Sequence, residues 1–371
     1  MSAAPPLTFG YLYDFRNPEP WRRPPADLYA ETIELAAWTE TAGFAGAWVP
    51  EHHAAEDGYM PAPHLALAAI AARTRTIRLG AAIALAPLYH PVRFAEECAV
   101  LDILSGGRLE TALAIGYRRR EYAMYGEAFA KRGARFDEFL AIVRALWRGE
   151  TVDFAGEHFR IERARIAPAA PRGHVPLYIG GFAEKALERV ARHADGYFGN
   201  EEVCDLYVAK LREQGRDPGA ARIRIQNLFL AVADDPERAM AELAPYYHHV
   251  SNSYGAWMAE DHAIGLEGPA MTPMDLDAFK ASGILQILTP DEAVAHFSAL
   301  RARMPVEHVM MMRPPGLPAE RFVAYASVFA EKVIGRLTPP YVGRAADESL
   351  VHSERLFTDC ASSDPSADER P

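Results

Sequence analysis

Short apolar runs alternate along the chain with longer segments in which apolar residues recur at helical spacing, and this alternation constrains the fold most. It is typical of βαβ units, in which crossover helices join parallel strands. Eight strands with intervening helices fit a closed barrel better than an open sheet, so we expect an α/β fold of the (β/α)8 TIM-like type. The expected strands are residues 7–12, 45–49, 77–85, 109–115, 175–179, 196–198, 223–232 and 309–312.

The barrel is expected to form a single domain over residues 1–342, with two insertions. The first insertion, at about 153–168, is predicted to be a hairpin that turns at Ala155-Gly156. The second, residues 244–287, is predicted to be long and irregular, and such segments often form lids or pocket walls. Residues 343–371 are rich in Ser, Asp and Glu and are predicted to be disordered.

Composition and charge exclude several classes of protein. The 371 residues carry a formal net charge of −11, which disfavours binding to nucleic acid. There is no run of about 18 apolar residues, so we expect no membrane span, and the first residues do not resemble a secretion signal. The three cysteines, Cys98, Cys204 and Cys360, are far apart and are expected to be reduced thiols. These features predict a cytoplasmic globular protein.

The active site of such a barrel lies at the C-terminal ends of its strands. This rule nominates Glu51-His52-His53 after the second expected strand, and Ala81-Ala82 in the third. It also nominates Gly116-Tyr117 after the fourth strand and Gly180-Gly181-Phe182 after the fifth. The sequence therefore predicts a site built from four separate parts of the chain.

The Glu51-His52-His53 cluster allows three interpretations. A metal site would need three or four convergent ligands, whereas neighbouring residues of an extended strand point to opposite faces, so we expect no metal here. A histidine could instead be structural, hydrogen-bonded beneath a loop. The third interpretation is that His52 donates to a bound cofactor or exchanges protons with it, which an imidazole pKa of about 6.5 suits.

Two further motifs are compatible with a phosphate group. Gly180-Gly181 precedes an expected helix, and backbone N–H groups at a helix N-terminus bind phosphate, although two glycines are also an ordinary strand–helix turn. The basic run Arg118–Arg120 could contact a phosphate or could form a solvated loop face. The residues leave both alternatives open.

The order and spacing of several motifs resemble those of the bacterial luciferase-like monooxygenases. The similarity covers roughly residues 7–200 and is looser beyond them. The motifs that carry it are Gly43-Phe44, Trp48-Val49-Pro50-Glu51-His52-His53, Leu79-Gly80-Ala81-Ala82, His90-Pro91-Val92-Arg93, Ser105-Gly106-Gly107-Arg108, Pro176-Leu177-Tyr178-Ile179-Gly180-Gly181 and Ala194-Asp195-Gly196-Tyr197.

This resemblance implies a flavin-dependent monooxygenase. Members of the family use reduced FMN, usually supplied by a separate flavin reductase, and O₂ to form a C4a-peroxyflavin that oxidises a small organic substrate. The resemblance also implies a homodimer or another oligomer. By position it assigns catalysis to His52 and cofactor contacts to Ala81, Ala82, Gly116, Tyr117, Gly180, Gly181 and Phe182. Ala81-Ala82 would lie against the flavin ring, where the family often has a non-proline cis peptide.

The sequence departs from the family pattern at the expected phosphate site. No hydroxyl residue follows the glycines in Phe182-Ala183-Glu184-Lys185, and Ile115 occupies the position of a luciferase arginine. Backbone amides, Lys185 or one of Arg118–Arg120 would have to compensate. Two rival functions also fit the motifs: an F420-dependent oxidoreductase that transfers hydride on the same fold, and a non-catalytic flavin-binding protein. A metal-dependent barrel hydrolase is a more remote alternative.

Overall fold

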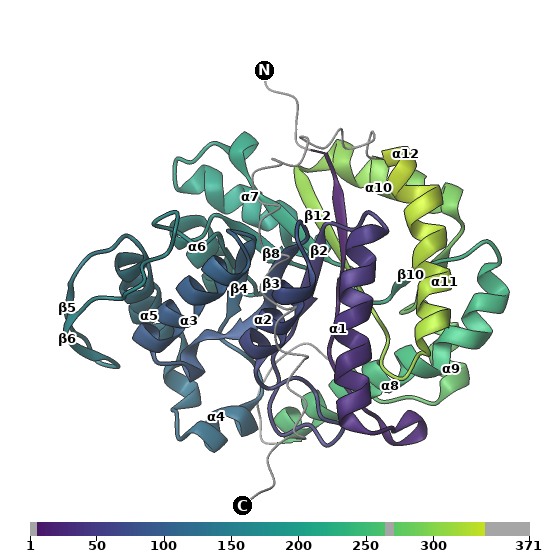
Figure 1. Cartoon of the computed structure of the whole chain (residues 1–371), viewed down its shortest axis with the longest axis horizontal. Helices are drawn as coiled ribbons and strands as arrows, with labels where there is room; N and C mark the ends of the chain where they lie inside the picture. Colours follow the sequence, from purple (N-terminus) through teal and green to yellow (C-terminus); the bar gives the residue numbers. More distant parts are fainter. Residues whose placement is uncertain (1–5, 264–270, 338–371) are drawn as a thin grey trace, which may run out of the picture. The chain divides into compact units, whose positions relative to one another are not determined.

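The protein folds into a closed barrel of eight parallel strands, as the computed structural model shows for residues 6–263 and 271–337 (Figure 1). The predicted (β/α)8 fold is therefore confirmed. The strands follow one another around the barrel in the order β1 (Thr8–Leu12), β12 (Val306–Met312), β9 (Ile223–Gln226), β8 (Gly196–Gly199), β7 (Leu177–Ile179), β4 (Leu109–Ala114), β3 (Arg78–Leu85) and β2 (Gly46–Val49).

Helices connect the strands and cover the outside of the barrel. Local sequence explains where several of them begin and end: Gly43, with a φ of 94°, follows the end of the first helix, and Thr289 forms a capping box with Glu292. The connecting helices include α1 (Pro25–Thr41), α2 (Pro63–Arg73), α3 (Pro91–Leu104), α5 (Arg132–Trp147), α6 (Glu184–His193), α7 (Cys204–Glu213), α10 (Pro290–Arg303) and α11 (Ala319–Phe329).

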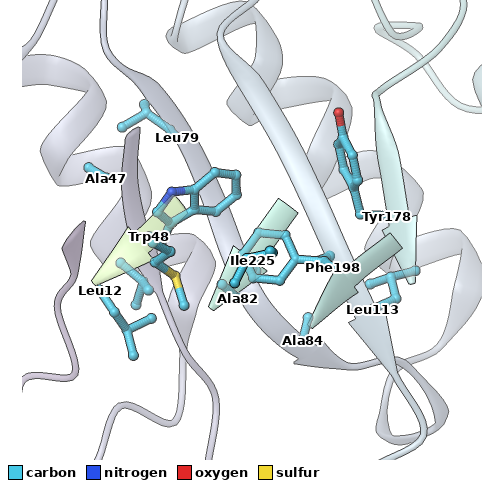
Figure 2. Close-up of a cluster of buried hydrophobic side chains, with 14 of the residues drawn as sticks. Leu12, Ala47, Trp48, Leu79, Ala82, Ala84, Leu113, Tyr178, Phe198 and Ile225 are labelled. Atoms are coloured by element: carbon cyan, nitrogen blue, oxygen red, sulfur yellow. The ribbon is translucent and has the colours of Figure 1, made fainter. Parts of the chain in front are cut away.

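The barrel interior is a packed core centred on Trp48. Its indole lies 5.1 Å from the ring of Phe198, and its Nε1 donates to Nε2 of His308 at 2.9 Å. A Cβ atom at Gly80 would approach the indole to 2.2 Å, and one at Gly46 would approach it to 2.5 Å. Glycine at these positions therefore makes room for the large side chain, whose neighbours include Phe198 and Ile225 (Figure 2). Because side chains fill the interior, a ligand is expected to bind among the loops at the strand ends.

The seventh expected strand, residues 223–232, was only partly right. β9 ends at Gln226, and Asn227 then donates its N–H to the carbonyl of Met310. The later part of the run forms β10 (Leu230–Val232), which pairs with β11 (Gln286–Leu288) in a separate two-stranded sheet. An apolar run can show that residues are buried, but it does not show which strand they pair with.

The first insertion is the predicted hairpin. β5 (Val152–Ala155) and β6 (Arg160–Ala164) pair antiparallel, and residues 156–159 form the turn between them. The predicted disordered tail, residues 343–371, lies outside the described residues.

The prediction of an irregular insertion over residues 244–287 was wrong. Much of the segment belongs to the long helix α8 (Pro236–Ala263), and a short helix, α9 (Leu276–Ala281), follows. Leu243, Tyr247 and Val250 are buried at helical spacing. Pro245 lies inside the helix, and because proline usually ends a helix, the sequence indicated a break here. Residues 264–270 of the predicted insertion lie outside the described part of the chain.

Within residues 6–263 and 271–337, no helix is both long and apolar enough to span a bilayer.

Candidate active site

His52 and Glu121 form a buried pair at the C-terminal end of the barrel strands. His52 follows β2 and is 8% exposed, while Glu121 lies in α4 (Arg119–Tyr125), just after β4. Nδ1 of His52 lies 2.9 Å from Oε1 of Glu121, and the same oxygen accepts a hydrogen bond from the backbone N–H of His53 at 2.9 Å. Burial alone would raise the pKa of Glu121, but His52, this N–H group and Arg118 together hold it below its usual value.

His53 points to a different carboxylate from the one that holds His52. Its Nε2 lies 2.9 Å from Oε1 of Glu51, and its Nδ1 lies 3.2 Å from the hydroxyl of Tyr125. Glu51 is held in turn by the backbone N–H of Leu85 at 2.8 Å. These contacts match the structural-histidine interpretation for His53. Across the described ranges, no group of three His, Cys, Asp or Glu side chains is placed to hold a metal ion.

Arg118 is part of the buried site and is not the solvated loop residue that one interpretation of the basic run expected. Its Nη1 donates to the carbonyl of His53 at 2.8 Å and lies 3.2 Å from Glu121. Its guanidinium lies 3.9 Å from the ring centroid of Trp257. Arg119 and Arg120, by contrast, are exposed. Nη2 of Arg118, like the hydroxyl of Tyr117, is buried without a hydrogen-bond partner in the described part of the chain.

The C-terminal half of α8 covers this site with aromatic side chains. The ring of Trp257 lies 5.0 Å from that of His52, and the ring of Tyr254 lies 6.1 Å from it. The hydroxyl of Tyr254 also lies 2.8 Å from that of Tyr59, whose ring contacts His52 at 4.9 Å. Figure 1 shows α8 and α4 at the same end of the barrel. A helix thus takes the covering position that was expected of an irregular lid.

A second polar cluster, centred on Arg16, adjoins the first and was not predicted from the sequence. Arg16 is 1% exposed. Its Nε donates to Asp57 at 2.6 Å, and its Nη2 donates to Ser253 at 2.6 Å. His249 lies within hydrogen-bonding distance of both Arg16, at 3.2 Å, and Asp57, at 2.8 Å. The strand-end rule could have nominated Arg16 and Asp14, because they directly follow β1.

The structure brings the predicted contacts of β3 and β7 together. Ala81 and Ala82 are buried in β3, and the non-proline cis peptide lies between Ala82 and Ile83, one bond later than Ala81-Ala82. A Cβ at Gly180 would lie 2.4 Å from Cδ1 of Ile83, so the glycine leaves room for the Ile83 side chain of β3. The role of these residues towards a cofactor stays a prediction.

The other predicted cofactor contacts lie on loops at the same strand ends. Gly116 has a φ of 70° and packs near Leu85, and Gly181 has a φ of 147°. Phe182 is 52% exposed, and α6 begins shortly afterwards at Glu184 without a side-chain cap on its N-terminal amides. The backbone N–H groups of this turn are therefore available to a ligand.

A closed parallel barrel with buried acid–base side chains after β2 and β4 defines an α/β-barrel protein whose ligand site lies at the C-terminal strand ends. The chain belongs to the luciferase-like monooxygenase family, whose model matches residues 7–307. The resemblance found in the sequence is thereby confirmed.

The relatives of this chain use different cofactors. It is 28% identical over 257 residues to the oxygenase component of flavin-dependent trigonelline monooxygenase from Acinetobacter baylyi, a match that covers 65% of this chain and 70% of that protein. It is 32% identical over 229 residues to F420-dependent glucose-6-phosphate dehydrogenase from Mycolicibacterium smegmatis, which covers 57% of this chain and 67% of that protein. Several other curated relatives are matched over only about half of their own length.

A solved structure supports the same fold. Monooxygenase RslO1 from Streptomyces bottropensis superposes with a TM-score of 0.75 at 23% identity, covering 89% of this chain and 99% of that one. The family to which this chain belongs thus includes proteins named as flavin monooxygenases and as F420-dependent oxidoreductases.

Proposed function

We propose that the protein is an FMN-dependent monooxygenase that uses reduced FMN and O₂ to oxidise a small organic substrate. The observation that carries this proposal is the burial of the His52–Glu121 pair beneath the aromatic side chains of α8. A reaction that passes through a reactive oxygen species needs a site from which water is excluded, because water destroys such species. The similarity to the trigonelline monooxygenase supports the same function.

The residues present fit a flavin. The Tyr117 hydroxyl and Nη2 of Arg118 are buried polar atoms that lack a partner among the described residues, so they are available to polar atoms of a ring system. Gly181 and the uncapped start of α6 provide backbone N–H groups that suit a phosphate, whereas the N–H of Gly180 is donated to the carbonyl of Leu113 at 2.9 Å. Reduced FMN, when bound, would supply the electrons that activate O₂.

His52 is suited to hold or move a proton at its Nε2 atom. Because an ionised Glu121 accepts from Nδ1, the neutral imidazole carries its proton there and presents an unprotonated Nε2. Protonation converts Nε2 into a donor while Glu121 stabilises the resulting charge. We therefore assign His52 as the catalytic residue, with Glu121 as the residue that positions it.

We further propose that a separate flavin reductase supplies the reduced FMN. The support is that the trigonelline relative is named as an oxygenase component, which implies a partner component in that system.

A second candidate function is hydride transfer to or from F420. It is favoured by the 32% identity to the F420-dependent glucose-6-phosphate dehydrogenase. Such an enzyme would not consume O₂, so cofactor binding and O₂ uptake separate the two functions.

The first experiment is an anaerobic titration of the full chain with reduced FMN and, separately, with F420. We expect reduced FMN to bind, and we expect O₂ uptake to become coupled to product formation when a panel of small organic compounds is screened. Binding of F420 without binding of reduced FMN would assign the protein to hydride transfer. Flavin binding without any turnover across the panel would favour the non-catalytic alternative.

Replacing Gly181 with Ala is expected to weaken the binding of reduced FMN. A φ of 147° is accessible to glycine but strained for other residues, and a Cβ would lie 2.6 Å from that of Ala186. The strain should destabilise the fold by about 1–3 kcal/mol and displace the turn before α6. Gly43→Ala is the matched control, since Gly43 also has a positive φ, 94°, but precedes β2 at the other end of the strands. Equal affinities of Gly181→Ala and wild type for reduced FMN would exclude this turn from the phosphate site.

We also propose that the protein forms a homodimer through α2 and α3. Leu65, Val100, Ile103 and Leu104 on these two adjacent helices are exposed apolar side chains. Burying such a group against its copy is favourable, because apolar surface leaves water. Leu104→Glu is therefore expected to shift the molar mass measured by light scattering from dimer to monomer. Leu206→Glu, at an exposed position on α7, should leave it unchanged. A monomeric wild-type protein would contradict the proposal.

A further inference from the structure

Three polar atoms of the Arg16 cluster are buried without a hydrogen-bond partner in the described part of the chain: Nη1 of Arg16, Oδ2 of Asp14 and Oδ1 of Asp57. The other atoms of these groups are well satisfied. Asp14 accepts from the backbone N–H of Arg16 at 3.2 Å, and Asp57 accepts from its Nε at 2.6 Å. Buried polar atoms are normally paired, so three open positions in one cluster indicate a polar ligand or ordered water.

The open atoms are one donor and two acceptors. A carboxylate or phosphate could accept from Arg16, but the charges of Asp14 and Asp57 would repel it. A hydroxyl or a primary amide can accept from the guanidinium and donate to a carboxylate at the same time. The cluster is therefore complementary to a neutral polar group that both donates and accepts.

The cluster adjoins the proposed catalytic residue through aromatic rings. The guanidinium of Arg16 lies 4.9 Å from the ring centroid of Tyr59, and the ring of Tyr59 lies 4.9 Å from that of His52. Trp257 contacts both ends, at 5.8 Å from the guanidinium and 5.0 Å from His52. A molecule held by Arg16 would thus lie among aromatic side chains next to the site of reaction.

We propose that Arg16 and Asp14 anchor the organic substrate, and that this substrate is a ring-bearing compound that carries a hydroxyl or a primary amide group. The assignment rests on the proposed monooxygenase function, because it takes His52 as the reacting end of the site. Arg16 and Asp14 determine specificity, whereas Asp57, Ser253 and His249 hold the guanidinium in position.

The test compares three probes of similar size: benzamide, benzyl alcohol and benzoate. Their binding to the full chain is measured by isothermal titration calorimetry under anaerobic conditions, with and without reduced FMN. We expect wild-type protein to bind benzamide and benzyl alcohol at least about tenfold more tightly than benzoate, the size of effect that one charge-assisted hydrogen bond gives. Asp14→Asn keeps the shape but removes the charge, so it should reduce this preference several-fold.

Two further variants separate anchoring from general structural effects. Arg16→Lys keeps the positive charge but loses the unpaired Nη1, so it should weaken the binding of all three probes. Asp137 forms an ion pair with Arg189 on the outside of the barrel, so Asp137→Asn should leave the affinity for all three probes unchanged. Thermal unfolding of each variant shows whether it is folded.

Three results would contradict the proposal that Arg16 and Asp14 anchor the substrate. They are tighter binding of benzoate than of benzamide, an unchanged preference in Asp14→Asn, and no detectable binding of any probe, which would leave water as the occupant. Failure of the proposed function is distinguishable, because it appears as absent binding of reduced FMN while the preference among the probes persists.

Discussion

Replacing His52 with Ala is expected to lower the rate of product formation by at least about 100-fold while leaving the binding of reduced FMN nearly unchanged. Nε2 of the imidazole can accept a proton and then donate it, while Nδ1 stays bonded to Glu121. Its loss should not disrupt the fold, because Glu121 keeps its bonds to the backbone of His53 and to Arg118. The measurement is product formed per reduced FMN consumed, with a substrate found in the screen, alongside the hydrogen peroxide released.

Glu121→Gln should have a smaller effect in the same direction. It preserves the shape of the site but no longer stabilises a protonated His52. The control is His174→Ala, since His174 is a half-exposed histidine that pairs with Asp195 away from the site. If product formation in His52→Ala equalled that of wild type, His52 would have no part in the mechanism. Glu121 could then not be assigned as the residue that positions it.

Replacing Asp14 with Asn is expected to stabilise the protein at neutral pH. Burial raises the pKa of Asp14 to about 6, although the charge of Arg16 and the N–H of the same residue oppose the rise, and Asp57 adds to it. The folded state therefore binds the proton more tightly than the unfolded chain, in which the pKa is near 3.8. The stability that this carboxyl contributes is fully present below about pH 3.8 and is lost as the pH rises through about 6.

The size of the effect follows from these two pKa values. Asp14 should destabilise the fold by ~3 kcal/mol at about pH 7.5, where it is ionised, and by ~1 kcal/mol at about pH 4.5, where it is protonated in the folded protein but mostly ionised in the unfolded chain. The advantage of Asp14→Asn should therefore shrink by about 2 kcal/mol between the two pH values. Urea unfolding of both proteins at the two pH values measures it. Asp57 does not confound the comparison, because its pKa is held at about 2 by His249 and Arg16 against the effect of burial, so its contribution is lost only below the range tested.

The exposed variant Asp137→Asn should show the same small difference at both pH values. An advantage of Asp14→Asn that did not change with pH would mean that the carboxyl is already neutral, or ionised without penalty, in the folded protein. With the expected result, a residue proposed to bind substrate would be one that lowers stability, as is common where function requires a buried charge.

The sequence by itself determined the barrel fold and the position of the part of the site around His52, but not that of the Arg16 cluster. Strand and helix periodicities are local features of the sequence. Their alternation along the chain therefore predicted the eight strands and most of the helices between them. Because the strand ends of a parallel barrel converge, the order of the elements also predicted that His52, Gly116 and Gly180 would follow their strands at one end of the barrel. That argument needs only the order of the elements along the chain.

Only the tertiary structure decided what covers the site and which charges meet inside it. Helix propensity counts against proline, so Pro245 led to the prediction that no helix passes through this segment. The packing of Leu243 and Tyr247 overrides the low propensity of proline, and α8 continues through Pro245. Arg16 and His249 lie 233 positions apart, and no local pattern relates them. Hydrogen bonds and charge interactions depend on distances of a few ångströms in space, and for residues so far apart in the sequence those distances are set by the folded barrel.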